Sequence, residues 1–252
     1  MTPDLPLHSD LWQQTLGWQP SESQQAVLQQ LYAEVLAANG QFNLTRITEP
    51  ADFWEKHLWD SLSGLAPWLD VNFAWSLPES LRSKPLRMID IGTGAGFPGI
   101  PAAIACPHWQ VTLLDSTQKK MRFLETLAQS LSLSNLSGLA SRAEMIGQQV
   151  AHRQRFDVAL ARAVGSASTC AEYALPLLRL GGLAVLYRGQ WSEADTEALQ
   201  PALDLLGGTI AHIQPSTTPL TQSQRHCLYL HKVGPTPSEF PRLPGIPAKL
   251  PL

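Results

Sequence analysis

Two kinds of hydrophobic pattern divide the chain near residue 86. Before that point, apolar side chains recur every three to four residues, the spacing typical of amphipathic helices. We expect one helix over residues 21–39, with serines available as its cap, and a second over residues 50–65. Residues 68–85 mix proline, serine and aromatic residues without a period, which indicates a long connection. Residues 1–85 therefore predict a helical extension followed by a connection.

From residue 86 onward, short apolar runs alternate with helical ones, a pattern typical of a parallel sheet covered by helices. The expected strands are 86–91, 110–115, 136–140, 156–161, 183–188, 209–214 and 226–232, and the expected helices are 98–105, 117–132, 168–179 and 192–206. The last two strands have no helix-length segment between them, so they should pair as an antiparallel hairpin. Residues 86–233 thus predict a mostly parallel, Rossmann-like α/β domain of seven strands, and the proline-rich residues 234–252 an extended tail.

Composition indicates a globular protein, because 44% of the 252 residues are hydrophobic and 15% are charged. No apolar stretch approaches the roughly 18 residues that span a bilayer, and the first twenty residues do not resemble a signal peptide. Cys106, Cys170 and Cys227 are odd in number and widely spaced. They predict reduced thiols in the cytoplasm and no metal site. We expect no membrane association and find no sign of an obligatory protein partner.

The net charge of −3 conceals an uneven distribution. Residues 1–85 carry ten acidic and four basic residues, whereas residues 86–252 carry eleven acidic and fourteen basic ones. A mildly basic second half is compatible with a nucleic-acid substrate, since phosphate attraction depends on local charge and not on the total.

A glycine-rich loop follows the first expected strand. Residues 86–99 read LRMIDIGTGAGFPG, and residues 111–115 read VTLLD. A strand, a glycine loop, a helix and a second strand ending in an acid are typical of a nucleotide-type cofactor site. Two templates fit the loop: counted from Asp90 it matches the S-adenosylmethionine pattern, and counted from Gly94 it matches the dinucleotide pattern.

Charge favours the first template. A dinucleotide site directs free backbone N–H groups at a pyrophosphate, whereas Asp90 places a negative charge beside the loop, and Pro98 and Pro101 each remove a donor. S-adenosylmethionine carries a sulfonium and an ammonium, which an acid suits. Asp115 can bind ribose hydroxyls in either class. An NAD(P)-binding oxidoreductase that uses the GAGFPG loop is the alternative.

Eight further stretches make the signal more specific. They are FNLTRIT (42–48), HLWDS (57–61), DIGTGAGFPGIP (90–101), TLLDS (112–116), KKMRFL (119–124), SRAE (141–144), ARAV (161–164) and QRHCLYLHK (224–232), with FPRLPGIPAK (240–249) in the tail. In this order they resemble the RsmG (GidB) family of bacterial small-subunit ribosomal RNA methyltransferases. The resemblance implies a class I methyltransferase fold and transfer of a methyl group from S-adenosylmethionine to nitrogen 7 of a guanine in 16S rRNA. Another RNA acceptor is not excluded by the residues themselves.

The resemblance also implies site residues. It assigns to the cofactor Gly92, Gly94, Phe97, Asp115, Ser116, Thr117, Ala143, Glu144 and Arg162. Arg188, Lys119 and Arg122 are candidates for contact with guanine or phosphate, although each could equally be an ion-paired or solvated side chain. The family usually has lysine and glycine after the fifth strand, where this chain has Arg188 and Gly189. Arg142 could pair with Glu144 for purely structural reasons.

No proton-transfer residue is expected, because nitrogen 7 of guanine has a free lone pair. Catalysis then rests on holding the two reactants in line, which supplies roughly 7–11 kcal/mol at best. The catalytic residues therefore stay unassigned. Five polar residues of the extension are expected to pack and hydrogen-bond against the α/β domain more often than to touch substrate: Asn43, Thr45, Arg46, His57 and Asp60.

Overall fold

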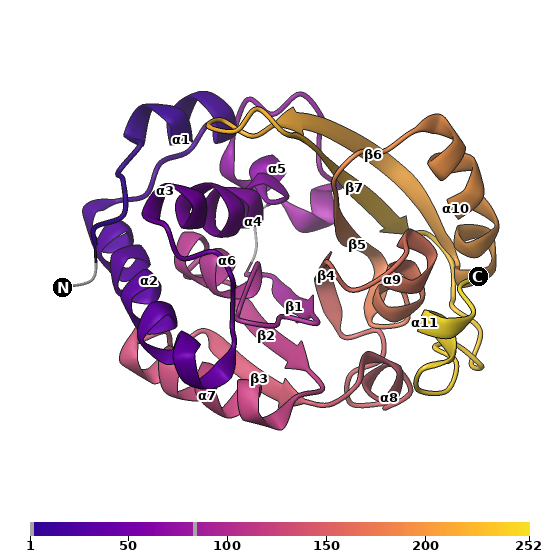
Figure 1. Cartoon of the computed structure of the whole chain (residues 1–252). Coiled ribbons are helices and arrows are strands. Elements are labelled where there is room, and N and C mark those ends of the chain that lie inside the picture. The colour runs from indigo at the N-terminus through magenta and orange to yellow at the C-terminus, as the bar shows by residue number, and fades with distance from the viewer. Residues whose placement is uncertain (1–2, 83–84) are drawn as a thin grey trace.

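A seven-stranded sheet forms the centre of the computed structural model, which describes residues 3–82 and 85–252. The strands lie in the order β3-β2-β1-β4-β5-β7-β6 (Figure 1). Their bounds are β1 (Arg87–Ile91), β2 (Gln110–Asp115), β3 (Leu136–Ala140), β4 (Phe156–Arg162), β5 (Leu178–Arg188), β6 (Gly208–Thr217) and β7 (Gln224–Lys232). Strands β1 to β5 pair in parallel, and β7 runs antiparallel between β5 and β6. The expected parallel sheet and terminal hairpin are confirmed.

Helices cover both faces of this sheet. Within the described residues they are α1 (Ser9–Leu16), α2 (Glu22–Phe42), α3 (Pro50–Phe53), α4 (Asp60–Ser63), α5 (Ala66–Leu69), α6 (Gly99–Ala105), α7 (Gln118–Ser130), α8 (Ala143–Gly147), α9 (Ala167–Ala174), α10 (Glu193–Leu206) and α11 (Ile246–Lys249). No helix of the described part of the chain is long and apolar enough to cross a membrane.

Alternation along the strands separates two hydrophobic cores, because neighbouring side chains in a strand point to opposite faces. Leu113 packs in the core that contains the N-terminal helices, α6 and α7. Its neighbour Leu114 packs in the other core, with α8, α9 and α10. The carboxyl ends of β1, β2 and β4 therefore lie between two rigid layers.

The second helix of the extension is interrupted. Residues 50–65 were expected to form one helix, but a π-helix, Trp54–Trp59, separates α3 from α4. Within it the carboxylate of Glu55 is fully buried and accepts hydrogen bonds from the backbone N–H groups of Leu220 (2.5 Å) and Thr221 (2.9 Å). These two residues lie in the loop that joins β6 to β7, so the extension is fixed to the terminal hairpin.

The 68–85 connection and the C-terminal tail, residues 234–252, are both held in place by hydrogen bonds. In the 68–85 connection, the indole N–H of Trp68 donates to the carbonyl of Leu81 at 3.0 Å, and residues 83 and 84 lie outside the described residues. The tail is not extended as expected: it folds back onto α8 and α9 and contains the short helix α11 (Figure 1). Proline-rich composition alone did not reveal the polar groups that hold it there.

Candidate cofactor site

The glycine loop leaves the carboxyl end of β1 and turns into α6. Gly92, Gly94 and Gly96 have φ of 70°, 59° and 97°, in the left-handed region that favours glycine. A Cβ at Gly92 would also lie 2.9 Å from a methyl carbon of Val164. Larger residues would therefore strain this turn or crowd it.

The backbone donors of this loop are largely used within the protein. Gly92 and Thr93 donate to the carbonyl of Leu114 at 2.8 and 3.0 Å, and Gly96 donates to the carbonyl of Thr93 at 2.9 Å. Gly99, the first residue of α6, donates to the Asp90 carboxylate at 2.8 Å. A pyrophosphate needs such N–H groups free, so the loop is poorly suited to a dinucleotide.

Asp90 acts differently from the expectation. It was placed near the ligand as a negative charge for the sulfonium compound, but it is fully buried beneath the loop. Its Oδ2 accepts hydrogen bonds from the hydroxyl of Thr93 (2.6 Å) and from Gly99, while its Oδ1 has no hydrogen-bond partner among the described residues. Burial raises the pKa of Asp90 to about 6, against the lowering effect of these two hydrogen bonds. Its structural role is to cap α6 and fix the loop.

A cavity of about 200 Å³ opens beside the loop at the carboxyl ends of β1 and β2. Its lining includes five residues predicted to bind the cofactor, namely Gly92, Asp115, Ser116, Ala143 and Glu144. The walls are completed by Ile91, Leu114, Ser141, Arg142, Val164, Tyr173 and Ala248. Ligands of open α/β sheets bind at this edge, so the position fits a cofactor site.

Asp115 ends β2 and faces this cavity. Its Oδ1 accepts a hydrogen bond from the backbone of Thr117 at 2.8 Å, and its Oδ2 accepts one from Gly94 at 3.1 Å. Each carboxylate oxygen has further acceptor capacity. The two bonds fix a partly exposed acceptor that suits the paired hydroxyls of a ribose, and they place Gly94 and Thr117 directly beside the cavity.

Glu144, in α8, also lines the cavity. Its Oε1 accepts hydrogen bonds from Arg142 (3.0 Å), the Tyr173 hydroxyl (3.3 Å) and the backbone of Gly245 (2.8 Å). Burial alone would raise the pKa of Glu144, but the hydrogen bonds from Arg142 and Gly245 outweigh burial and lower it below its usual range. The pairing of Arg142 with Glu144 is confirmed, and Glu144 is a fixed carboxylate.

Four predicted cofactor residues are outside the lining of this cavity: Gly94 and Thr117, which both bond to Asp115, and Phe97 and Arg162. The Phe97 ring stacks on His57 at 4.5 Å between centroids, and the Arg162 guanidinium lies 5.9 Å from the Phe97 ring centre. Arg162 donates to Asp60 Oδ2 at 2.8 Å, and Arg225 donates to Asp60 Oδ1 at 3.2 Å. One carboxylate of the extension thus joins β4 to β7.

His57 is the most perturbed basic group here. Burial, followed by the nearby charge of Arg162, lowers the pKa of His57 to about 3, so the ring is neutral at physiological pH. Its Nε2 is 2.8 Å from the Thr45 hydroxyl, and its Nδ1 has no hydrogen-bond partner in residues 3–82 and 85–252. As expected, His57 and Asp60 of the extension contact the α/β domain, whereas the hydroxyl of Thr45 bonds to His57 within the extension.

The candidate RNA-binding residues are spread over two regions. Arg188 ends β5 beside a second cavity, of about 430 Å³, and donates to the carbonyl of Gly165 at 2.7 Å. Lys119 donates to the carbonyl of Gln41 at 2.9 Å and lies over the Phe42 ring, so it contacts the extension. Arg122 is exposed on α7.

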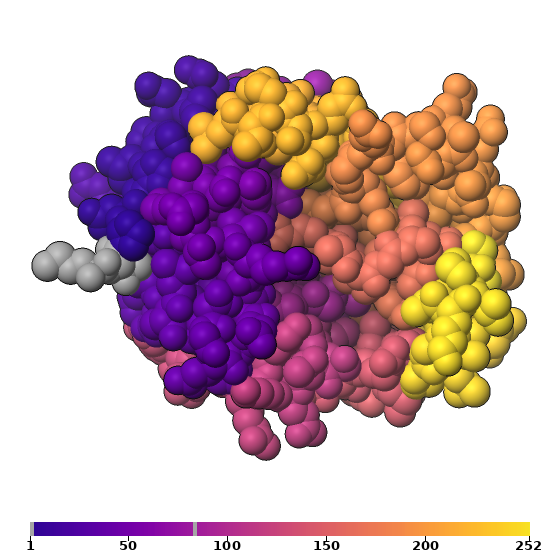
Figure 2. All heavy atoms as spheres, in the orientation of Figure 1, coloured from indigo at the N-terminus to yellow at the C-terminus, as the bar shows by residue number. Residues whose placement is uncertain are grey.

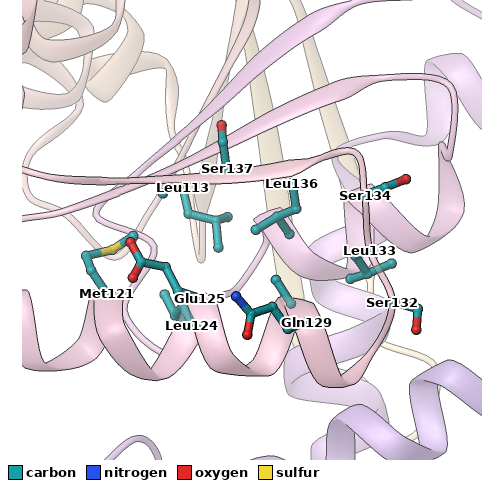
Figure 3. A pocket seen from close by; sticks show the side chains of 12 residues that line it. Leu113, Met121, Leu124, Glu125, Gln129, Ser132, Leu133, Ser134, Leu136 and Ser137 are labelled. Atoms are coloured by element: carbon teal, nitrogen blue, oxygen red, sulfur yellow. The ribbon is translucent and has the colours of Figure 1, made fainter.

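A third cavity, of about 370 Å³, lies between α7 and the edge strand β3 (Figure 3). Leu113, Leu124 and Leu136 form its apolar floor, and Glu125 and Gln129 of α7 stand beside it. It contains none of the predicted cofactor residues and lies on the Leu113 face of the sheet, opposite the cofactor cavity.

Sequence reasoning missed several residues of the site. Tyr173 and Ala248 line the cofactor cavity, and Arg225 shares Asp60 with Arg162. Arg225 falls within the QRHCLYLHK stretch, which marked the segment by its resemblance to the family but did not indicate that Arg225 pairs with Asp60. Ala248 offered no signal, because an exposed alanine in a proline-rich tail has no distinctive chemistry.

The fold and the site together define a class I S-adenosylmethionine-dependent methyltransferase: a parallel sheet with a terminal antiparallel hairpin, a glycine loop after β1 and an acid at the end of β2. A family model described as rRNA small subunit methyltransferase G (GidB) matches residues 24–227. The chain belongs to this family.

Relatives support the family, and a solved structure supports the fold. "Ribosomal RNA small subunit methyltransferase G" of Trichormus variabilis is 56% identical over the full length of both chains, and that of Nostoc punctiforme is 53% identical over the same extent. A crystal structure of a 16S rRNA (adenine(1408)-N(1))-methyltransferase from Catenulisporales acidiphilia is similar in fold. Its TM-score is 0.51 at 17% identity, over 62% of this chain and 88% of that one.

Proposed function

We propose that this chain transfers the methyl group of S-adenosylmethionine to nitrogen 7 of a guanine in 16S rRNA. The observation that carries the proposal is the cavity lined by both Asp115 and Glu144 beside a loop whose N–H groups are mostly bonded within the protein. The names of the relatives support rRNA as the substrate class. The same loop disfavours an NAD(P)-dependent oxidoreductase, which would need free donors for its pyrophosphate.

The residues of the cavity fit the methyl donor in distinct ways. Asp115 accepts the ribose hydroxyls, with Ser116 and Thr117 beside it, and Ala143 and Glu144 take the adenine edge. Gly92 and Gly94 have no side chain, so the backbone of the loop can approach the methyl donor closely. Phe97 and Arg162 lie on the side toward the extension, where they limit the space open to the methionine portion and the incoming base.

The proposed methyl transfer needs no general acid or general base. S-adenosylmethionine supplies an electrophilic methyl group bonded to a positively charged sulfur. The lone pair of guanine nitrogen 7 forms the new bond to that methyl carbon while the carbon–sulfur bond breaks and its electron pair returns to sulfur. No proton leaves the base, and the positive charge moves from sulfur to the guanine ring. The protein's task is to align the reactants.

RNA contact is assigned to basic side chains around the carboxyl edge of the sheet. Arg188 has a guanidinium beside the second cavity, and its planar fork suits either the guanine O6 and N7 edge or a phosphate. Arg122 and Lys119 contribute positive charge on α7, and the bond from Lys119 to Gln41 of the extension holds its ammonium group in place. We place the activity in the cytoplasm, where the small ribosomal subunit is the partner.

The test is transfer of a labelled methyl group to 16S rRNA that lacks the modification. The product should be 7-methylguanosine at one position, identified by nuclease digestion and mass spectrometry. Label on a carbon atom or an exocyclic amine would contradict the mechanism without a base. Label on transfer RNA alone would contradict the substrate.

A further inference from the structure

The C-terminal segment, defined as residues 240–252, lies between the cofactor cavity and the second cavity. Ala248 lines the first cavity, and Leu252 lines the second together with Arg188. In Figure 2 the segment forms a compact raised patch beside the residues of α9 and α10, not a free arm. Only three residues of the chain therefore separate the two residues that line different cavities.

A buried ion pair fixes the start of this segment. The Glu172 carboxylate on α9 is fully buried. The Arg242 guanidinium donates to both of its oxygens, from Nε to Oε1 at 3.0 Å and from Nη2 to Oε2 at 2.6 Å. The backbone N–H of Arg242 adds a third bond to Oε1 at 2.8 Å. A buried carboxylate without its partner is costly, so the segment is held firmly at this point.

The segment then reaches into the cofactor cavity. The backbone of Gly245 donates to Glu144 Oε1 at 2.8 Å, and the Thr169 hydroxyl on α9 donates to the carbonyl of Pro247 at 2.9 Å. Glu144 lines this cavity together with Asp115. Its orientation thus depends partly on an N–H group that is contributed from about a hundred residues further along the chain.

We propose that the C-terminal segment is a working part of the cofactor site: Arg242 positions it, Gly245 orients Glu144, and Ala248 forms the wall against which the adenosine portion packs. The inference rests on the proposed role of Glu144 at the adenine edge. Arg242 and Gly245 are positioning residues, since they act through Glu144 and α11. The segment sets affinity for the methyl donor and not the rate of methyl transfer.

The wall is tested with a matched pair of substitutions in α11. Ala248 and Lys249 are adjacent and both exposed, but only Ala248 lines the cofactor cavity. Ala248→Phe should therefore weaken binding of S-adenosylhomocysteine, measured by calorimetry without RNA, by about tenfold or more, since an aromatic ring would fill a small cavity. Lys249→Phe should bind it like the wild type. Equal affinity in the two variants would overturn the inference.

The positioning role is tested with Arg242→Gln and Arg242→Lys. Arg242→Gln removes the paired hydrogen bonds to Glu172, so the segment is held less firmly beside Glu144. The dissociation constant of S-adenosylhomocysteine should rise about tenfold, with partial recovery in Arg242→Lys. The apparent KM for S-adenosylmethionine should rise while kcat stays within about twofold. A purely structural role would lower the melting temperature and leave affinity unchanged in the folded protein, and that result would refute the proposal.

The two proposals can fail separately. Binding of S-adenosylhomocysteine needs no RNA, so a wild-type chain that binds it but does not methylate 16S rRNA refutes the proposed function alone. A wild-type chain that methylates rRNA, with Ala248→Phe binding normally, refutes the role of the segment alone. No binding by the wild-type chain would overturn both.

Discussion

Replacement of His57 by glutamine should change how stability depends on pH. The His57 pKa is lowered from 6.5 to about 3 because the ring is buried and lies near Arg162. A histidine with a lowered pKa binds fewer protons in the folded state than in the unfolded state. Its contribution is therefore complete above about pH 6.5 and is lost as the pH falls toward 3.

The magnitude follows from the two pKa values. Each pH unit between them corresponds to about 1.4 kcal/mol, so the full effect is about 5 kcal/mol at very low pH. At pH 5 the folded ring is still neutral and the unfolded ring is almost fully charged. His57 should then lower the free energy of unfolding by about 2 kcal/mol relative to pH 8.

Urea unfolding at pH 8 and pH 5 measures this effect. His57→Gln should be less stable than the wild type at pH 8, because it loses the stacking on Phe97. Between pH 8 and pH 5, however, it should lose about 2 kcal/mol less than the wild type. His108→Gln changes an exposed histidine and serves as the control. If the difference between wild type and His57→Gln is the same at both pH values, the reasoning is wrong.

Three further outcomes are expected. The pKa of Asp90 is raised to about 6, so its contribution to the free energy of unfolding is largest at low pH and declines by about 3 kcal/mol as the pH rises from about 4 through 6. In urea titrations, Asp90→Asn should abolish this dependence of stability on pH. Arg162→Ala should reduce methyl transfer roughly 100-fold in a turnover assay but lower the melting temperature only slightly, because Asp60 retains Arg225; loss of the folded state would instead assign Arg162 a structural role. Gly99→Ala should cost about 1–3 kcal/mol in chemical unfolding, since the added methyl would overlap Leu113 and press on Asp90, and an unchanged stability would contradict this packing.

The sheet was predictable because its signal is local. Strands such as β1 and β2 are short apolar runs that end in turn residues, and the run of two strands without a helix between them gave the hairpin. The expected ranges agree with the observed strands to within about two residues, apart from two strands. Strand β5 begins five residues earlier than expected, at Leu178, and β6 ends three residues later than expected, at Thr217. The additional part of β5 contains Gly181 and Gly182, which weaken the strand pattern.

The site was predictable where one residue acts on its own strand or loop, and unpredictable where partners lie far apart in sequence. Asp115 was found because it ends a strand after a glycine loop. The pairing of Asp60 with Arg162 spans 102 residues, and that of Glu144 with Gly245 spans 101. Periodicity carries no information over such separations, so the folded geometry was needed to find them.

The cap that Asp90 places on Gly99 has a bearing on how the protein meets its ligand. Carboxylate and carbonyl groups of the protein accept hydrogen bonds from the turn after β1, so the shape of this turn does not depend on bonds to a ligand. Such preorganisation spares the complex the entropy of ordering a loop. In the proposed complex, this turn therefore needs no rearrangement to receive the methyl donor.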